Sequence, residues 1–334
     1  MNNLRPGFPL QPQTIDTHYI SAHMAASHLM IEKGEALFID VGTSPACGLL
    51  LKEVVRQGLQ PEQVRYIILT HIHLDHGGGA SQLMQHCPQA TLLVHPKGAG
   101  HMIEPERLVK ATAEVYGEKL FRKLYGEIGP IDERRVKTVS EGFRLDFNGR
   151  PLHFYDTPGH ARHHCCIWDP ASGGLFSGDT CGMAYPFLQT DKIRPFLMPA
   201  TAPTAFEPAE MINSIRRLME LDPVFLYLPH FGPVSAHRQS IEALIELIEK
   251  HGRCAEVETE FDHDATTARL QDILYKSYLN FGDSRLTKSE FIAFLAGDIE
   301  INVQGIAARW ARLQKNNSKI AKKDPEQPDG CSGS

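Results

Sequence analysis

The first hundred residues alternate between short apolar runs and helical patterns. Runs rich in β-branched and aromatic side chains predict strands. They lie at residues 27–31, 36–41, 64–70 and 91–95. Between them, the spacing of apolar residues predicts helices at residues 47–57 and 79–85. This alternation of strands and helices is typical of an α/β fold.

The middle of the chain breaks this rhythm. Apolar residues recur at helical spacing through residues 98–130, at Leu108, Val115, Tyr116, Leu120 and Leu124. We therefore predict a mostly helical insertion there. Short apolar runs predict strands again at residues 144–147, 152–155, 165–168, 175–177 and 224–228. Residues 186–208 hold five prolines and predict an irregular loop, followed by a helix at 209–221.

The last third of the chain is helical in pattern. Ile241, Leu244, Ile245 and Ile248 mark an amphipathic helix. Helical patterns continue from about residue 253 to 314, and residues 315–334 are polar without an apolar period. We therefore predict a catalytic domain over residues 1–252, a helical extension over 253–314 and a flexible tail over 315–334.

Composition narrows the class of protein. The chain has 334 residues, of which 42% are hydrophobic and 22% charged, as in ordinary globular proteins. The net charge of -6 favours no nucleic-acid partner. Apolar runs are too short to cross a membrane, and the seven cysteines form no CxxC pair. We expect a cytoplasmic protein with free thiols and a small-molecule substrate.

One short motif concentrates metal-binding side chains. Within six residues, directly after the predicted strand 64–70, come His71, His73, Asp75 and His76. Imidazole and carboxylate groups are the usual ligands of catalytic zinc or iron. Four such residues in so short a span have a low chance frequency, so we predict a metal site here.

Three more candidates also follow predicted strands. His160 comes after strand 152–155 in the sequence TPGH, Asp179 after strand 175–177 in SGD, and His230 after strand 224–228 in PH. Strand ends converge at one edge of a sheet, where loops build sites on a rigid frame. We expect these three side chains to lie beside the His71–His76 motif.

The order HxHxDH, TPGH, SGD and PH resembles the metallo-β-lactamase superfamily, most closely its glyoxalase II-type thioesterases and related dinuclear hydrolases. The resemblance covers about residues 15–250. It implies a four-layer αβ/βα sandwich, here with the helical insertion and the C-terminal helical extension. It also implies that Asp40, at the end of strand 36–41, supports the site without binding metal.

The resemblance further implies a ligand set. His71, His73 and His160 would hold one metal ion, Asp75, His76 and His230 a second, and Asp179 would bridge the two. The cofactors would be two divalent ions, zinc first, with iron or manganese as alternatives. Such a pair, about 3.5–4 Å apart, shares a bridging hydroxide that attacks a thioester, ester or lactone carbonyl. Asp75 would both bind metal and orient that hydroxide.

Two other activities stay open from the sequence. One is a mononuclear-iron sulfur dioxygenase of the same superfamily; the complete second ligand set argues against it. The other is a phosphodiesterase. We also expect a homodimer, because two-fold dimers are the commonest oligomers; light scattering of the 37.3 kDa chain tests this.

The remaining histidines are predicted to be structural or exposed. Adjacent residues of a strand point to opposite faces, so the four residues 163–166 (HHCC) cannot all bind one ion. Tyr116 and Tyr125 either pack the insertion onto the core or contact substrate.

Overall fold

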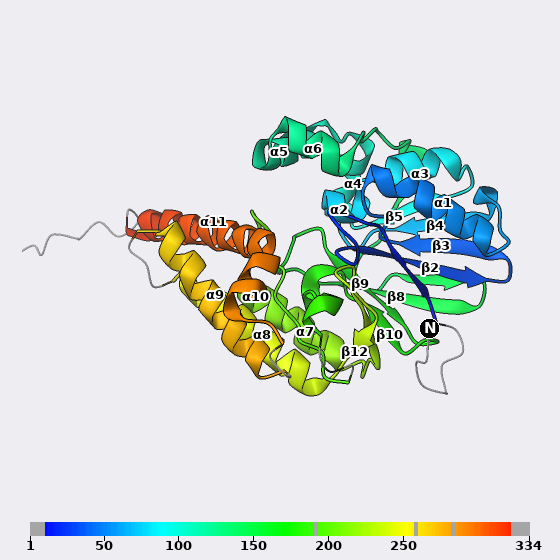
Figure 1. Cartoon of the computed structure of the whole chain (residues 1–334). Helices are drawn as coiled ribbons and strands as arrows, with labels where there is room; N and C mark the ends of the chain where they lie inside the picture. Colours follow the sequence, from blue (N-terminus) through cyan, green and yellow to red (C-terminus); the bar gives the residue numbers. More distant parts are fainter. Residues whose placement is uncertain (1–10, 190, 192, 257–259, 282–284, 322–334) are drawn as a thin grey trace, which may run out of the picture.

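Two six-stranded β-sheets form the centre of the molecule (Figure 1). The structure is a computed structural model and describes residues 11–189, 191, 193–256, 260–281 and 285–321. The first sheet contains, in spatial order, β1 (Gln13–Asp16), β2 (Ala26–Glu32), β3 (Glu35–Ile39), β4 (Val64–Ile68), β5 (Thr91–Val94) and β6 (Val136–Thr138). Its strands β3 to β6 are parallel to one another. The strand β2 is antiparallel to both of its neighbours, β1 and β3.

The second sheet runs in the order β12 (Val234–Ser235), β11 (Phe225–Tyr227), β10 (Gly174–Phe176), β9 (Cys165–Asp169), β8 (Arg150–Asp156) and β7 (Arg144–Phe147). Its pairs are antiparallel except β10 with β11, which is parallel. A crossover connects these two parallel strands, and it contains the Pro-rich loop and the helix α7 (Pro208–Met219).

The alternation of side chains along the strands builds the layers. On β3, Leu37 and Ile39 join the cluster between the sheets, whereas Phe38 packs on the opposite face. On that outer face lie α1 (Cys47–Arg56) and α3 (Ala80–His86). The outer face of the second sheet packs against α7 and α8 (Arg238–Cys254). These layers are the predicted four-layer αβ/βα sandwich (Figure 1).

The predicted insertion is helical. It contains α4 (Pro96–Ile103), α5 (Glu106–Tyr116) and α6 (Glu118–Tyr125). The helix α6 packs through Phe121 and Tyr125 in a cluster with Tyr19 and Leu74, and α5 packs against this cluster through side chains such as Tyr116. Leu74 lies in the short helix α2 (Leu74–Gly77). The insertion is thereby attached directly to the metal-binding motif.

The C-terminal extension forms α9 (His263–Leu279), α10 (Lys288–Phe294) and α11 (Ala296–Ala321). These helices share a hydrophobic cluster with Met183, Phe196 and Met198 of the loop that follows Asp179. Asn302 of α11 fixes this contact, because its Oδ1 accepts a hydrogen bond from the Thr201 amide at 3.0 Å. The extension therefore packs on the loop that shapes the site.

Several boundaries differ from the sequence predictions. The strands β1, β6 and β12 were not predicted, and β6 and β12 have only three and two residues. The tail predicted from residue 315 is wrong at its start, because α11 continues to Ala321. Residues 322–334 of the predicted tail lie outside the described part of the chain. The division into domains stays a prediction; α8 ends two residues beyond 252, at Cys254.

In the described residues, no single helix is both long and apolar enough to cross a membrane. The bent pair formed by α10 and α11 as far as Asn316 passes by length and composition, with a bend of 71°. Its apolar side chains Phe291, Ile299 and Val303 are buried in the cluster with α9.

Candidate metal centre

The seven candidate residues come from the ends of four strands in both sheets. His71 and His73 follow β4, and Asp75 and His76 lie in α2, whose first turn begins directly after His73. His160 follows β8, Asp179 follows β10 and His230 follows β11. Because both sheets end at the same edge of the sandwich, all seven side chains meet there.

Two glycines allow the loops to approach closely. Gly159, beside His160, has a φ of +128°, and a Cβ there would lie 2.2 Å from the Met211 amide nitrogen of α7. Gly178, beside Asp179, has a φ of +45°, and a Cβ there would lie 2.3 Å from His164 Nε2. A side chain at either position would clash with these neighbours, so glycine is required beside each of the two candidate ligands.

The first group of ligand atoms is made of three imidazoles. His73 Nδ1 lies 3.0 Å from His71 Nε2 and 3.0 Å from His160 Nε2. The rings are buried or nearly so, and their nitrogens face a common point. Three neutral imidazoles converging in this way form a typical site for a transition-metal ion.

The second group combines one carboxylate with two imidazoles. Asp75 Oδ2 lies 3.4 Å from His76 Nε2 and 3.3 Å from His230 Nε2, and these two nitrogens are 3.3 Å apart. This mixed set of nitrogen and oxygen atoms also suits zinc, iron or manganese.

Asp179 lies between the two groups. Its Oδ2 is 3.5 Å from His160 Nε2 and 4.0 Å from His71 Nε2. Its Oδ1 is 3.5 Å from His76 Nε2 and 3.7 Å from His230 Nε2. Each carboxylate oxygen thus faces one group. In the described part of the chain, Oδ1 is buried and accepts no hydrogen bond, so it is available to a cation.

The outward nitrogens of the imidazoles support the same interpretation. His160 Nδ1 donates to the Ala200 carbonyl at 2.9 Å, and His230 Nδ1 donates to the Met24 carbonyl at 2.8 Å. A proton on Nδ1 leaves the lone pair on the inward Nε2. Metal-binding histidines are usually oriented in this way, so the residues present fit a pair of metal ions.

Asp40 orients the site from behind. Its Oδ2 lies 3.3 Å from His76 Nδ1 and accepts a hydrogen bond from the Thr70 hydroxyl at 2.8 Å. Its Oδ1 accepts from the Thr70 amide at 2.8 Å, and the Thr70 hydroxyl lies 3.1 Å from His71 Nδ1. The backbone of Asp40 is left-handed, with a φ of +52°. Few residues other than Gly, Asn and Asp adopt this conformation readily.

The electrostatics of the site separate the histidines into two kinds. Burial, reinforced by the neighbouring imidazoles, lowers the pKa of His71 and His73 well below the ordinary value. Burial also works against the charged form of His76, but the Asp75 and Asp179 carboxylates outweigh it and raise the pKa of His76. Burial alone would raise the pKa of the Asp75 carboxyl. The neighbouring imidazoles of His76 and His230 outweigh burial and hold this pKa well below the usual range.

Sequence reasoning missed the role of His164. Its ring is fully buried, and its Nε2 accepts a hydrogen bond from the Asp179 amide at 3.1 Å. Its Nδ1 lies 2.7 Å from the Thr157 hydroxyl. His164 therefore positions the loop that carries Asp179. Among the described residues, no group that could hold a metal includes any of residues 163–166.

A hollow of about 690 Å³ opens onto the centre. Its lining includes five of the seven candidates, namely His73, Asp75, His160, Asp179 and His230. Tyr116 and Tyr125 line it too, and they also pack the insertion, because the Tyr125 hydroxyl lies 2.9 Å from that of Tyr19. The packing of the insertion by these tyrosines is therefore confirmed, and their contact with substrate stays a prediction.

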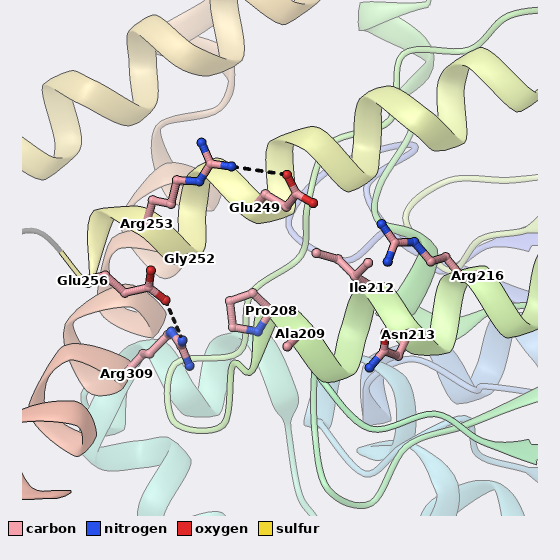
Figure 2. A pocket seen from close by; sticks show the side chains of 10 residues that line it. All are labelled: Pro208, Ala209, Ile212, Asn213, Arg216, Glu249, Gly252, Arg253, Glu256 and Arg309. Carbon is pink, nitrogen blue, oxygen red and sulfur yellow. Dashed lines mark hydrogen bonds and ion pairs between the residues drawn. The ribbon is translucent and has the colours of Figure 1, made fainter.

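A second, smaller hollow lies between α7, α8 and α11 (Figure 2). Two of its arginines already have carboxylate partners: Arg253 lies 3.5 Å from Glu249, and Arg309 lies 3.0 Å from Glu256. None of the seven candidate ligands lines it. The chemistry of the molecule therefore belongs to the larger hollow.

The fold and this His/Asp centre define a class of metalloproteins, and comparison with known proteins identifies it. Residues 22–230 match the metallo-beta-lactamase superfamily, and the chain belongs to this superfamily. All seven candidate ligands lie within the matched residues.

Individual relatives are more distant. The chain is 29% identical over 178 residues to the metallo-beta-lactamase fold-containing protein ST1585 of Sulfurisphaera tokodaii, which covers 52% of this chain and 63% of that protein. It is 24% identical to the probable metallo-hydrolase YqjP of Bacillus subtilis, over 71% of this chain and 76% of that one. A hydroxyacylglutathione hydrolase of Xanthomonas axonopodis pv. citri is 28% identical, over 60% of this chain and 57% of that protein. The match thus spans less than two thirds of the first and third relatives.

Solved structures show the same fold. The ST1585 structure from Sulfolobus tokodaii superposes with a TM-score of 0.59 and 22% identity, over 90% of this chain and 99% of that one. The metallo-beta-lactamase family protein TTHA1429 from Thermus thermophilus superposes with a TM-score of 0.57 and 22% identity, over 86% of this chain and 93% of that one.

Proposed function

We propose that the protein is a dinuclear metal-dependent hydrolase of a thioester, ester or lactone. The observation that carries this proposal is the position of Asp179, whose two oxygens each face a separate group of ligand atoms. Two relatives of the chain, which are named as a probable metallo-hydrolase and a hydroxyacylglutathione hydrolase, support the same class of reaction.

The residues of the chain would divide the work. His71, His73 and His160 would hold one divalent ion, Asp75, His76 and His230 the other, and Asp179 would bind both, with zinc as the first choice. When bound, such a pair supplies a hydroxide at neutral pH and polarises a carbonyl oxygen. Asp75 is held as a carboxylate by His76 and His230, so it can accept a hydrogen bond from the attacking hydroxyl and orient it.

The walls of the hollow would orient the substrate. Tyr19, Tyr116 and Tyr125 place phenol groups on the insertion side of the same hollow as Asp75. Burial raises the pKa of all three phenols above the ordinary value, so they stay protonated and can donate hydrogen bonds at neutral pH.

The variant His73→Ala tests this assignment, because His73 Nδ1 is the atom shared by both close contacts of the first group. We expect bound metal to fall and kcat/KM on a thioester or lactone to drop by roughly 100-fold or more, with the circular dichroism spectrum unchanged. The control is His86→Ala, because His86 is exposed at the end of α3. This variant should keep both the bound metal and the wild-type kcat/KM. Full activity of His73→Ala would contradict the proposal.

A further inference from the structure

The hollow above the metal centre has two walls that the central sandwich does not supply. One wall is the insertion, through α5 and α6, and the other is the start of α11 with the end of α10. In Figure 1 α5 and α6 lie at the top of the view and α10 and α11 lie below them at the left, both beside the end of the sandwich where α2 lies. Because five of the candidate ligands lie in the same hollow, whatever these walls bind reaches the centre.

The mouth of the hollow is unusually apolar. Ile20, Val115 and Leu120 line it, and they are 65%, 48% and 44% exposed. Seven large hydrophobic side chains among the described residues are more than 40% exposed, and three of them line this one hollow. Exposed apolar side chains that cluster in this way usually mark a binding surface.

Apolar side chains continue inward and along the opposite wall. Leu74 and Met183 lie near the ligand residues Asp75 and Asp179 in sequence and line the same hollow. Phe294 lines it from the end of α10, and its ring lies 4.8 Å from that of Phe187. The hollow thus offers apolar contacts both at its mouth and beside the metal centre.

Outside the metal centre, the charges of the lining do not favour a strongly anionic ligand. Apart from the candidate metal ligands, its charged side chains are Asp298 and Glu300 of α11 and Lys123 of α6. Burial raises the pKa of Asp298 to about 6, so Asp298 is an anion above that pH. Lys123 is the one ammonium in the described lining, which contains no guanidinium. Beyond the metal centre, a leaving group with two carboxylates, such as glutathione, would meet two acids and a single exposed cation.

We propose that the substrate is an ester or thioester of a medium to long apolar carboxylic acid with an uncharged or weakly charged leaving group. Its acyl chain lies along Ile20, Val115 and Leu120, and its carbonyl lies at the metal centre. This inference rests on the proposed hydrolase function. Each CH₂ group buried along this wall should raise kcat/KM about fourfold, which corresponds to about 0.8 kcal/mol.

The test uses the full chain loaded with zinc and a series of p-nitrophenyl esters from acetate to dodecanoate. The double variant Val115→Thr with Leu120→Asn keeps the approximate size of both side chains and removes their apolar character. A matched control, Val55→Thr with Leu279→Asn, changes two side chains of similar exposure (55% and 42%) that do not line the hollow. Both side chains lie on other helices, α1 and α9.

We expect kcat/KM to rise with chain length in the wild type and in the control. In the Val115→Thr/Leu120→Asn variant the acetate ester should react as in the wild type, while the gain for the longer esters falls by roughly tenfold. A flat dependence on chain length, with hydrolysis intact, would overturn the inference and leave the proposed function standing.

Binding separates the inference from the reaction. Calorimetric titration should show that dodecanoate binds the zinc-loaded wild type at least tenfold more tightly than butyrate, and that the Val115→Thr/Leu120→Asn variant reduces this difference by roughly tenfold. If no ester is hydrolysed but dodecanoate binds in this way, the proposed function fails and chain recognition stands. Light scattering provides one more outcome: a wild-type dimer that this variant dissociates would show that the mouth is a contact between subunits, and would overturn the inference.

Discussion

Asp40 acts on the metal centre through its neighbours. It accepts hydrogen bonds from both polar groups of Thr70, and it lies against His76 Nδ1. Its carboxylate therefore fixes the orientation of one candidate ligand directly and of His71 through Thr70. Partners of this kind tune the basicity and the orientation of metal-binding imidazoles.

The variant Asp40→Asn isolates this role. Asparagine tolerates the left-handed backbone at this position, so the fold should be kept. An NH₂ group, which donates, replaces one acceptor oxygen of the carboxylate, however, so His76 or Thr70 loses its hydrogen-bond acceptor. We expect zinc affinity to fall by roughly 10- to 100-fold in a chelator competition titration. Asp132→Asn, at an exposed carboxylate that pairs with Arg134, is the control; equal affinities in all three proteins would contradict this role.

At the scale of the residue, the sequence is informative where chemistry is concentrated in a motif. His71, His73, Asp75 and His76 stand together, and the other three candidates each follow a strand within a few residues, so their convergence could be predicted. His164 could not be assigned in this way. The alternation of side chains along a strand predicts only that residues 163–166 do not all bind one ion, and only the contact of His164 with the Asp179 amide shows that it holds a loop.

At the scale of the element, α8 carries a buried histidine outside the metal centre. His251 Nδ1 donates to the Leu247 carbonyl at 2.7 Å, and its Nε2 is buried with no hydrogen-bond partner among the described residues. Burial lowers its pKa from 6.5 to about 4. The folded state therefore holds the neutral ring in a range where the unfolded chain binds a proton.

This difference makes α8 sensitive to acid. The stabilising effect of the neutral ring is complete above pH 6.5 and is lost progressively as the pH falls toward 4. The loss amounts to on the order of 3 kcal/mol. We predict that His251→Leu flattens the decline of unfolding free energy between pH 6.5 and 4 in urea titrations. His86→Leu, on the surface of α3, should decline as the wild type does; an equally steep decline in His251→Leu would contradict the prediction.

Element boundaries were predictable where apolar residues repeat. The strand predicted at residues 36–41 corresponds to β3, and that at 64–70 corresponds to β4, because both segments are rich in apolar side chains. The strands β6 and β12 are too short to give a pattern. The end of α11 was missed because residues 315–321 are mostly polar and have no apolar period; only the continuing helix shows that they belong to it.

At the scale of the whole molecule, the sequence predicts the sandwich but not the hollow. The lining joins Tyr19 near the N-terminus, the insertion, the loop after Asp179 and α11, which are far apart in the chain. Their meeting depends on tertiary contacts such as the hydrogen bond from the Thr201 amide to Asn302. Helical periodicity indicates which face of α11 is apolar, but it does not indicate what that face packs against.

The central claim is that one chain holds two metal ions in a single centre. Elemental analysis of the protein purified without added metal tests it most directly, with the His73→Ala variant measured in parallel. We predict about two divalent ions per chain, zinc first, and a clear loss in the variant. One iron per chain, with oxygen uptake on persulfide substrates, would contradict the dinuclear hydrolase in favour of a mononuclear dioxygenase. No metal, with none taken up on addition, would contradict the metal centre itself.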